Sequence, residues 1–270
     1  MAGVNYVVVV LCLPETYAPR LLERKMLALH DGMRREPKEK FGSRLVQSLL
    51  RPWIMLFTEP ILFALSLYMA FIYGVLFLDF TAYPVAFQSS RNWSVGISGL
   101  SFLGLGTGMA LATILSPLVG RIHARYVAKL GPVPEARLPH LVLLAWLLPL
   151  GLFWFGWTAL PPTPWIVPIL AGVPFGFGLV MLFLGINSYL TDCYDRFSAS
   201  ALAANSMLRS LFGAGFAVFA ADMYEALGAP WATSLLGFVA LAMGLFPLLF
   251  YLYGPRLRAA SRFHLQATQT

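Results

Sequence analysis

Three charged side chains within or beside long apolar stretches of this chain could hold or pass charge. They are Glu59, Asp192 and Arg209. A charged side chain in hydrocarbon costs roughly 2.5–3.5 kcal/mol on insertion scales, so each should face protein or water and have a partner. Arg209 lies about ten residues into its stretch, or about 15 Å deep. We expect it to pair with Glu59 or Asp192, either as a static ion pair between helices or as a gate or proton-linked charge switch.

The acidic residues also have simpler interpretations. Glu59 precedes Pro60, which predicts an irregular turn, and its carboxylate could snorkel to the membrane interface. Asp192 and the nearby Asp195 stand at the end of a stretch and could be solvated. Asp79 falls near the outer end of its stretch, and we expect it to reach water.

Aromatic and uncharged polar side chains inside the stretches could bind an organic solute. We expect this of Tyr68, Phe71, Tyr73 and Asn205. Aromatic rings stack on organic cations or aromatic solutes, and a phenol hydroxyl adds a hydrogen bond. The alternative for each ring is helix packing, while Asn205, one turn before Arg209, could bridge helices instead of lining a cavity. Asn187 and Tyr189, nearer the end of a stretch, could belong to an inner gate.

Glycine and proline interrupt the centres of two stretches. Gly104 and Gly108 have the four-residue spacing that allows close helix contact. Pro174, Gly176 and Gly178 belong to a Pro-Phe-Gly-Phe-Gly run, and transporter helices break at such places. We expect this run to be a point of helix flexing that frees backbone carbonyls, with a static kink as the alternative.

Six apolar stretches must position these residues. They cover residues 54–79, 96–118, 140–159, 165–188, 199–221 and 231–253. A helix needs roughly 20 residues to cross a bilayer, which each stretch supplies. The composition agrees, since 59% of the residues are hydrophobic and 11% are charged, against about 25% charged in soluble domains. Lipid offers backbone groups no partner, so the fold class is all-α, an integral membrane bundle of six transmembrane helices.

Lysine and arginine are concentrated in alternate loops and therefore on one side of these stretches. The segment before the first stretch, the loop after the second and the tail are basic, while the opposite loops carry one base, Arg91. Because cytoplasmic loops carry an excess of Lys and Arg, both termini should be cytoplasmic. We also expect the membrane to be the plasma membrane. The net charge of +7 then reflects topology and attraction to lipid, and nucleic acid is not an expected partner.

The pattern divides the chain into four parts. Residues 1–13 are apolar but about half a span long, so we interpret them as the remnant of a preceding transmembrane helix. Residues 14–53 should form a cytoplasmic central loop, 54–253 the six-helix bundle and 254–270 a cytoplasmic tail.

The sequence holds no motif for covalent chemistry. It lacks a phosphate-binding loop, His-Glu-x-x-His and Gly-x-Ser-x-Gly, and its four histidines form no cluster. The two cysteines, Cys12 and Cys193, predict neither a disulfide nor a zinc site. We therefore expect no enzyme, no cofactor and no metal.

Several segments resemble one family. They are residues 13–22, 51–53, 57–61, 66–74, 171–178 and 200–214, the last reading Ser-Ala-Leu-Ala-Ala-Asn-Ser-Met-Leu-Arg-Ser-Leu-Phe-Gly-Ala. They are similar to the stretch that leaves the sixth helix, and to the seventh, tenth and eleventh helices, of fungal drug:proton antiporters of the major facilitator superfamily. This branch includes multidrug and polyamine exporters.

The resemblance implies a twelve-helix transporter whose two six-helix halves rock around a central cavity and export drugs, toxins or polyamines in exchange for protons. This chain is similar to the C-terminal half only. Residues 116–125 keep a degenerate form of the family's Gly-x-x-x-Asp-Arg gating loop without its acid, which puts proton coupling within this half alone in question.

We therefore expect a half-transporter fragment that is inactive alone. Its partners would be the lipid bilayer, a small organic solute, and either a missing N-terminal six-helix half or a second copy of the chain. The alternative is a non-transporting membrane scaffold or partner-binding subunit.

Overall fold

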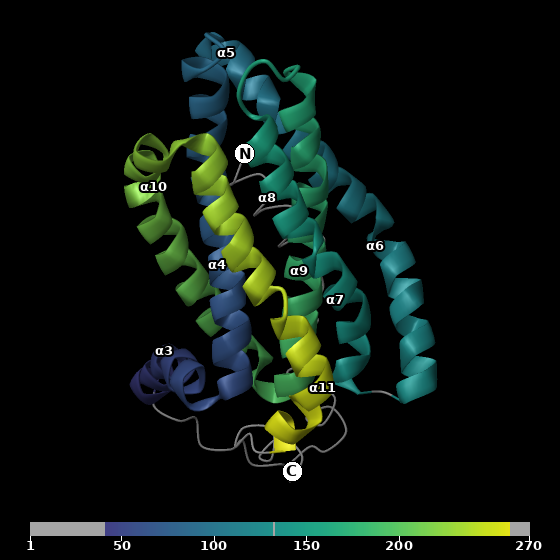
Figure 1. The fold of residues 1–270 in the computed structure, drawn as a ribbon. Coiled ribbons are helices and arrows are strands. Elements are labelled where there is room, and N and C mark those ends of the chain that lie inside the picture. Colours follow the sequence, from purple (N-terminus) through teal and green to yellow (C-terminus); the bar gives the residue numbers. More distant parts are fainter. Residues whose placement is uncertain (1–40, 132, 260–270) are drawn as a thin grey trace, which may run out of the picture. The chain divides into compact units, whose positions relative to one another are not determined.

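The computed structural model describes residues 41–131 and 133–259 (Figure 1). The chain divides into two units, Met1–Gln47 and Ser48–Thr270, and all contacts described below lie within the second. The predicted helix remnant at 1–13, most of the predicted loop at 14–53 and the tail beyond residue 259 lie outside the described residues.

Every regular element in these ranges is helical. The α-helices are α3 (Phe41–Thr58), α4 (Pro60–Pro84), α5 (Val95–Ser98), α6 (Leu103–Leu130), α7 (Leu138–Ala145), α8 (Leu147–Thr158), α9 (Ile166–Tyr194), α10 (Ser198–Met243) and α11 (Phe246–Ala259). A π-helical turn, Val85–Ser89, extends α4, and three 3₁₀ turns, Gly99–Phe102, Pro134–Arg137 and Asp195–Phe197, precede α6, α7 and α10. The all-α membrane bundle predicted from the sequence is confirmed.

Within the described ranges, five helical runs are long and apolar enough to cross a bilayer. They are Pro60–Ser89, Val95–Lys129, Pro134–Thr158, Ile166–Tyr194 and Ser198–Gly254. The last has 57 residues and would extend about 85 Å if straight, far beyond a hydrocarbon core of about 30 Å. It turns back at Gly228, whose φ of 71° and ψ of 161° interrupt α10 (Figure 1). Six crossings are compatible with this reversal, but the number remains a prediction.

The first predicted stretch, 54–79, begins too early. The backbone of Glu59 is extended, with φ −105° and ψ 106°, and α4 starts at Pro60. Proline suits the first position of a helix because its fixed φ is helical and its missing N–H has no helical acceptor there. Residues 54–58 therefore end α3, and the predicted irregular turn at Glu59 is confirmed.

Several helices continue past the stretches predicted for them. The predicted stretch 96–118 lies within a run that extends to Lys129, and 165–188 lies within a helix that ends at Tyr194. Hydropathy marks only the part of a helix that lies in hydrocarbon, whereas backbone hydrogen bonding continues into the polar zone. The sequence therefore located these two helices but ended them too early.

Four glycines, which we call the glycine seam, bring α6 and α9 into backbone contact. A Cβ added at Gly104 would clash with the carbonyl oxygen of Ile169, and one at Gly108 would clash with that of Val173. From the other side, Cβ atoms at Gly172 and Gly176 would collide with the backbone of residues 104 and 105. The close contact predicted for Gly104 and Gly108 is confirmed.

Helix α9 is unbroken through the predicted flexing point. Pro174 lies inside one continuous helix from Ile166 to Tyr194. A Cβ at Gly178 would lie 3.1 Å from the Leu147 Cβ, so this glycine packs against α8. The expectation of a broken helix with freed carbonyls is therefore wrong for this conformation, because close packing holds Gly176 and Gly178 in the helix. Flexing of Pro174, Gly176 and Gly178 stays a prediction.

Candidate functional site

Helices α9 and α10 form a hairpin whose polar residues face each other in register. Asn187 lies seven residues before the end of α9, and Asn205 lies seven residues after the start of α10. The Asn205 Nδ2 donates to the Asn187 Oδ1 at 2.9 Å. Phe183 and Arg209 lie one further turn from the hairpin connection on each side, so they meet at the next level.

The guanidinium of Arg209 sits between two aromatic rings. Its Cζ lies 4.9 Å from the ring centroid of Tyr73 on α4 and 4.9 Å from that of Phe183 on α9. Cation–π attraction of this kind is worth about 0.5–2 kcal/mol per ring. We call Tyr73, Phe183, Asn187, Asn205, Ser206 and Arg209 the Arg209 site.

Polar compensation for the charge of Arg209 is slight. The Arg209 Nη2 donates to the Ser206 Oγ at 3.4 Å, and the buried Nε has no acceptor among the described residues. No carboxylate within that part of the chain lies within the 4.0 Å of an ion pair. The predicted pairing of Arg209 with Glu59 or Asp192 is therefore wrong, because packing gives both acids other partners.

Glu59 is held inside the protein and does not snorkel. Its side chain is 1% exposed, and Tyr194 Oη donates to its Oε2 at 3.2 Å. The extended backbone before Pro60 directs α4 away from α3, and the carboxylate meets the end of α9. The snorkelling interpretation is wrong.

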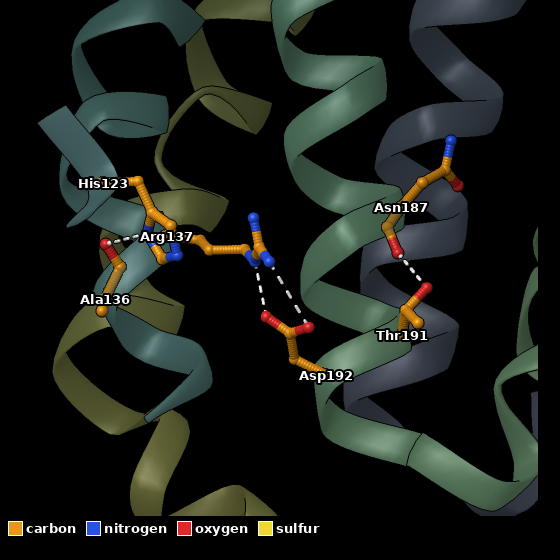
Figure 2. Close-up of polar contacts among 6 residues, drawn as sticks. All are labelled: His123, Ala136, Arg137, Asn187, Thr191 and Asp192. Carbon is orange, nitrogen blue, oxygen red and sulfur yellow. Dashed lines mark hydrogen bonds and ion pairs between the residues drawn. The ribbon is translucent and has the colours of Figure 1, made fainter. Parts of the chain in front are cut away.

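Asp192 forms an ion pair with Arg137 near the end of α9 (Figure 2). The Arg137 Nε donates to one carboxylate oxygen at 2.5 Å, and the Nη2 donates to the other at 3.5 Å. Because the two side chains are 29% and 37% exposed, water screens the pair. Asp192 is thus partly solvated, as one interpretation of the sequence predicted. The three charges predicted to form a relay lie in three separate environments.

The four predicted solute-binding residues fall into two pairs. Tyr73 and Asn205 belong to the Arg209 site. Tyr68 is 1% exposed and packs edge-on against Phe246, while Phe71 packs edge-on against Phe216. In this conformation Tyr68 and Phe71 lie in the core, although the Tyr68 hydroxyl has no hydrogen-bond partner in the described part. A solute-binding role for all four remains a prediction.

An open hollow adjoins the Arg209 site. It has a volume of about 600 Å³ and is lined by Trp53, Ala203, Ser206, Met207, Ser210 and Leu211. Ser206 belongs to both, since it lines the hollow and accepts the hydrogen bond from Arg209. Cavities of 300–1,000 Å³ are typical of sites for drug-sized molecules.

Asp79 was misjudged from the sequence. It is 3% exposed, so the expectation that it reaches water is wrong. Its carboxyl interacts electrostatically with the hydroxyls of Tyr83 on α4 and Tyr224 on α10. A cavity of about 10 Å³ beside Asp79 and Tyr83 has room for roughly one water molecule. No hydrogen bond or ion pair joins the Asp79 carboxyl to another described residue.

Arg91, the one basic residue of the loops on the less basic side, has a structural role. The Arg91 Nε and Nη2 both donate to the Ala159 carbonyl oxygen at 3.1 Å, beyond the end of α8. Partial burial lowers the pKa of the Arg91 guanidinium below its usual value. Cations suit the carbonyl end of a helix, so Arg91 fastens the loop after α4 to α8.

Sequence analysis did not assign roles to Phe183 and Ser206. Phe183 could have been found from the short connection between the fourth and fifth stretches, because residues equally distant from a tight hairpin turn face each other. Ser206 could have been found from its position three residues before Arg209 on the same helix. Asp79 could have been found from Tyr83, which lies one turn further along the same buried helix face.

These features define a multi-pass helical membrane protein with a polar site between three spans. A sequence profile described as Major Facilitator Superfamily matches residues 1–218, and the chain belongs to this family. It is 48% identical to the Major facilitator superfamily multidrug transporter mdrA of Aspergillus fumigatus, over 95% of this chain and 44% of that protein. The resemblance to fungal efflux proteins of this superfamily is thereby confirmed.

Two further relatives agree. The chain is 42% identical to the MFS-type efflux pump MFS2 of Trichophyton rubrum, over 97% of this chain and 46% of that protein. It is 44% identical to the Citrinin biosynthesis cluster MFS transporter mrr1 of Monascus ruber, over 95% of this chain and 54% of that protein. The chain thus spans about half the length of the curated relatives that it matches. No solved structure gives a significant match.

Proposed function

We propose that this chain forms one half of an exporter of organic solutes, such as drugs, toxins or polyamines, that works by alternating access. The observation that carries the proposal is the Arg209 site, in which polar and aromatic groups from three spans gather beside a hollow of solute size. Relatives named as a multidrug transporter and an efflux pump support it. A scaffold would satisfy its polar groups internally, whereas the buried Arg209 Nε has no acceptor in the described part of the chain.

A second six-helix half would supply the opposite wall of the cavity. Alternating access needs two bundles that rock against each other, and this chain matches about half of each relative. The second bundle would be an N-terminal half or a second copy of the chain. The chain would sit in the plasma membrane with both termini in the cytoplasm, and this half alone would be inactive.

Vesicle transport tests the proposal. The chain is reconstituted alone, and together with the N-terminal half of the mdrA relative, with a fluorescent organic solute and an imposed pH gradient. We expect gradient-dependent solute transport only when both halves are present. Transport by the chain alone would overturn the half-transporter proposal, and no transport by the well-folded pair would overturn the exporter proposal.

Proton entry would drive export through buried carboxyls. Asp79 and Glu59 are 3% and 1% exposed within or beside α4, and acids at membrane depth are typical of proton relays. The titratable groups that interact with Asp79 are the hydroxyls of Tyr83 and Tyr224. The side chains from α8 and α9 at its cavity are apolar.

Asp79→Asn keeps the shape of the side chain and removes its proton-binding group. We expect gradient-driven export by the paired halves to fall at least about tenfold, because a proton-transfer group contributes much more than that. Solute binding should not change. Asp222→Asn, at an exposed position on α10, is the matched control. Gradient-driven export at the wild-type rate in the Asp79 variant would refute the assignment.

A further inference from the structure

We propose that Arg209 anchors an anionic oxygen of the exported solute, so that the site takes organic acids in preference to neutral or cationic compounds. This deepens the proposed function and rests on it. The claim concerns recognition, so it can be tested by binding without any transport.

The charge balance of the site favours an anion. Arg209 is the only charged residue of the Arg209 site, and the acids that sequence analysis offered as partners, Glu59 and Asp192, are bound to Tyr194 and Arg137. The neighbours of the guanidinium on α4 and α9 are the rings of Tyr73 and Phe183. Neither ring neutralises the charge, so a cationic solute would be repelled and an acid attracted.

The guanidinium is also held in place for a ligand. The two rings, each 4.9 Å away, restrict its movement, while its buried Nε–H has no acceptor in the described part. Its one hydrogen bond, to the neutral Ser206 hydroxyl, is long at 3.4 Å. A carboxylate matches the planar fork of arginine donors, and such charge-assisted hydrogen bonds are about twice as strong as neutral ones.

A second buried polar atom without a hydrogen-bond partner among the described residues lies one helical turn from Arg209. Asn205 is 1% exposed, and its Nδ2 is already used by Asn187, but its Oδ1 accepts no hydrogen bond from any described residue. A buried acceptor without a donor is unfavourable, and a hydroxyl on the ligand would supply the missing hydrogen bond. Together, the Arg209 Nε–H and the Asn205 Oδ1 favour an acid that also carries a hydroxyl or N–H donor.

The hollow lies beside these two polar groups, because Ser206 belongs to both the hollow and the Arg209 site. Ser206 lines it at the turn between Asn205 and Arg209, and Trp53 and Leu211 add apolar walls. An aromatic acid could rest its ring against these walls and direct its carboxylate toward Arg209. The ring faces of Tyr73 and Phe183 would remain occupied by the guanidinium.

Binding to the purified chain in phosphatidylcholine nanodiscs tests the inference. Equilibrium dialysis compares three probes of one shape, 1-naphthoate, 1-naphthamide and 1-naphthylmethylammonium. We expect naphthoate to bind the wild-type chain at least about tenfold more tightly than the other two. Arg209→Gln should remove this preference, Arg209→Lys should keep part of it, and Arg121→Gln, at an exposed position on α6, should keep all of it.

Three results would overturn the inference. The first is equal affinity of the wild-type chain for naphthoate and naphthamide. The second is an equal loss of affinity for both probes in the Arg209→Gln variant. The third is no binding of naphthoate to wild-type chain whose helical circular dichroism and single elution peak show that it is folded. An equal loss of both would mean that Arg209 acts on structure alone. Acid-selective binding without transport by the paired halves would instead count against the proposed function only.

Discussion

The two ends of α9 meet their neighbours in opposite ways. Toward its start, the glycine seam brings the backbones of α9 and α6 so close that no glycine of the seam has room for a Cβ. Toward its end, the Arg209 site holds a charged guanidinium, two asparagines and two rings, and some of their hydrogen-bonding atoms have no partner among the described residues. The comparison teaches that a single helix can combine a seam closed by sterics with a site left open for a ligand.

The two ends differ in what stabilises them: van der Waals contact at the glycine seam, and hydrogen bonding that is incomplete among the described residues at the Arg209 site. In lipid, apolar helices gain little from hydrophobic burial, so close backbone approach and van der Waals packing hold them together. The glycine seam uses that source of stability fully. The Arg209 site forgoes part of it, since buried donors and acceptors there have no partner among the described residues.

The largest effect should come from filling the glycine seam. In Gly104→Ala the new methyl group meets the Ile169 carbonyl oxygen, which belongs to the backbone and cannot rotate away. We expect the free energy of unfolding to fall by about 1–3 kcal/mol, measured by thermal or denaturant unfolding in detergent.

Gly106→Ala is the matched control on the same helix, because a Cβ there has no neighbour within 4 Å. Its stability should be unchanged or rise by about 0.5–1 kcal/mol, since alanine loses less backbone entropy than glycine. Equal stability of the two variants would show that the α6–α9 contact is looser than described.

A smaller effect should come from the asparagine pair at the other end of α9. In a double-mutant cycle of Asn187→Ala and Asn205→Ala, we expect a coupling energy of about 0.6 kcal/mol, and at most about 1.7 kcal/mol, as is usual for hydrogen bonds between membrane helices. The measurement is unfolding in detergent of the wild type, both single variants and the double variant. A coupling energy near zero would mean that Asn205 does not hold Asn187 and is free to face the hollow.

The smallest effect should come from the exposed ion pair of Arg137 and Asp192. Asp192→Asn should cost between about 0 and 1 kcal/mol of unfolding free energy, and less at high salt, because both side chains contact water. Asp195→Asn, also at an exposed position beside the hairpin connection, is the control. A loss above about 2 kcal/mol that persists in high salt would make this pair a structural lock.

Parts of the Arg209 site were predictable and parts were not. Arg209 and Asn205 stood out because a charge and an amide are rare inside apolar stretches. The partners of these two residues could not be predicted, because an apolar stretch indicates where a residue lies along its helix but not which neighbouring helix its side chain faces. Ion pairing was the simplest expectation for Arg209, whereas the structure surrounds it with rings and gives Glu59 to Tyr194.

The glycine seam shows the reverse case. The spacing of Gly104 and Gly108 predicted a close contact correctly, since only glycine lets two helix backbones touch. The Pro174 to Gly178 run has a similar composition, yet it forms continuous helix that packs against α6 and α8. Small residues permit both flexing and close packing, and the neighbours decide which occurs.

The sequence by itself determined that lipid surrounds this protein and that its spans are helices, because hydrocarbon leaves the backbone no other means of hydrogen bonding. Only the tertiary structure decided which polar groups meet. The rotation and register of each helix follow from packing against all its neighbours together, and these placed Arg209 between two rings and enclosed Asp79.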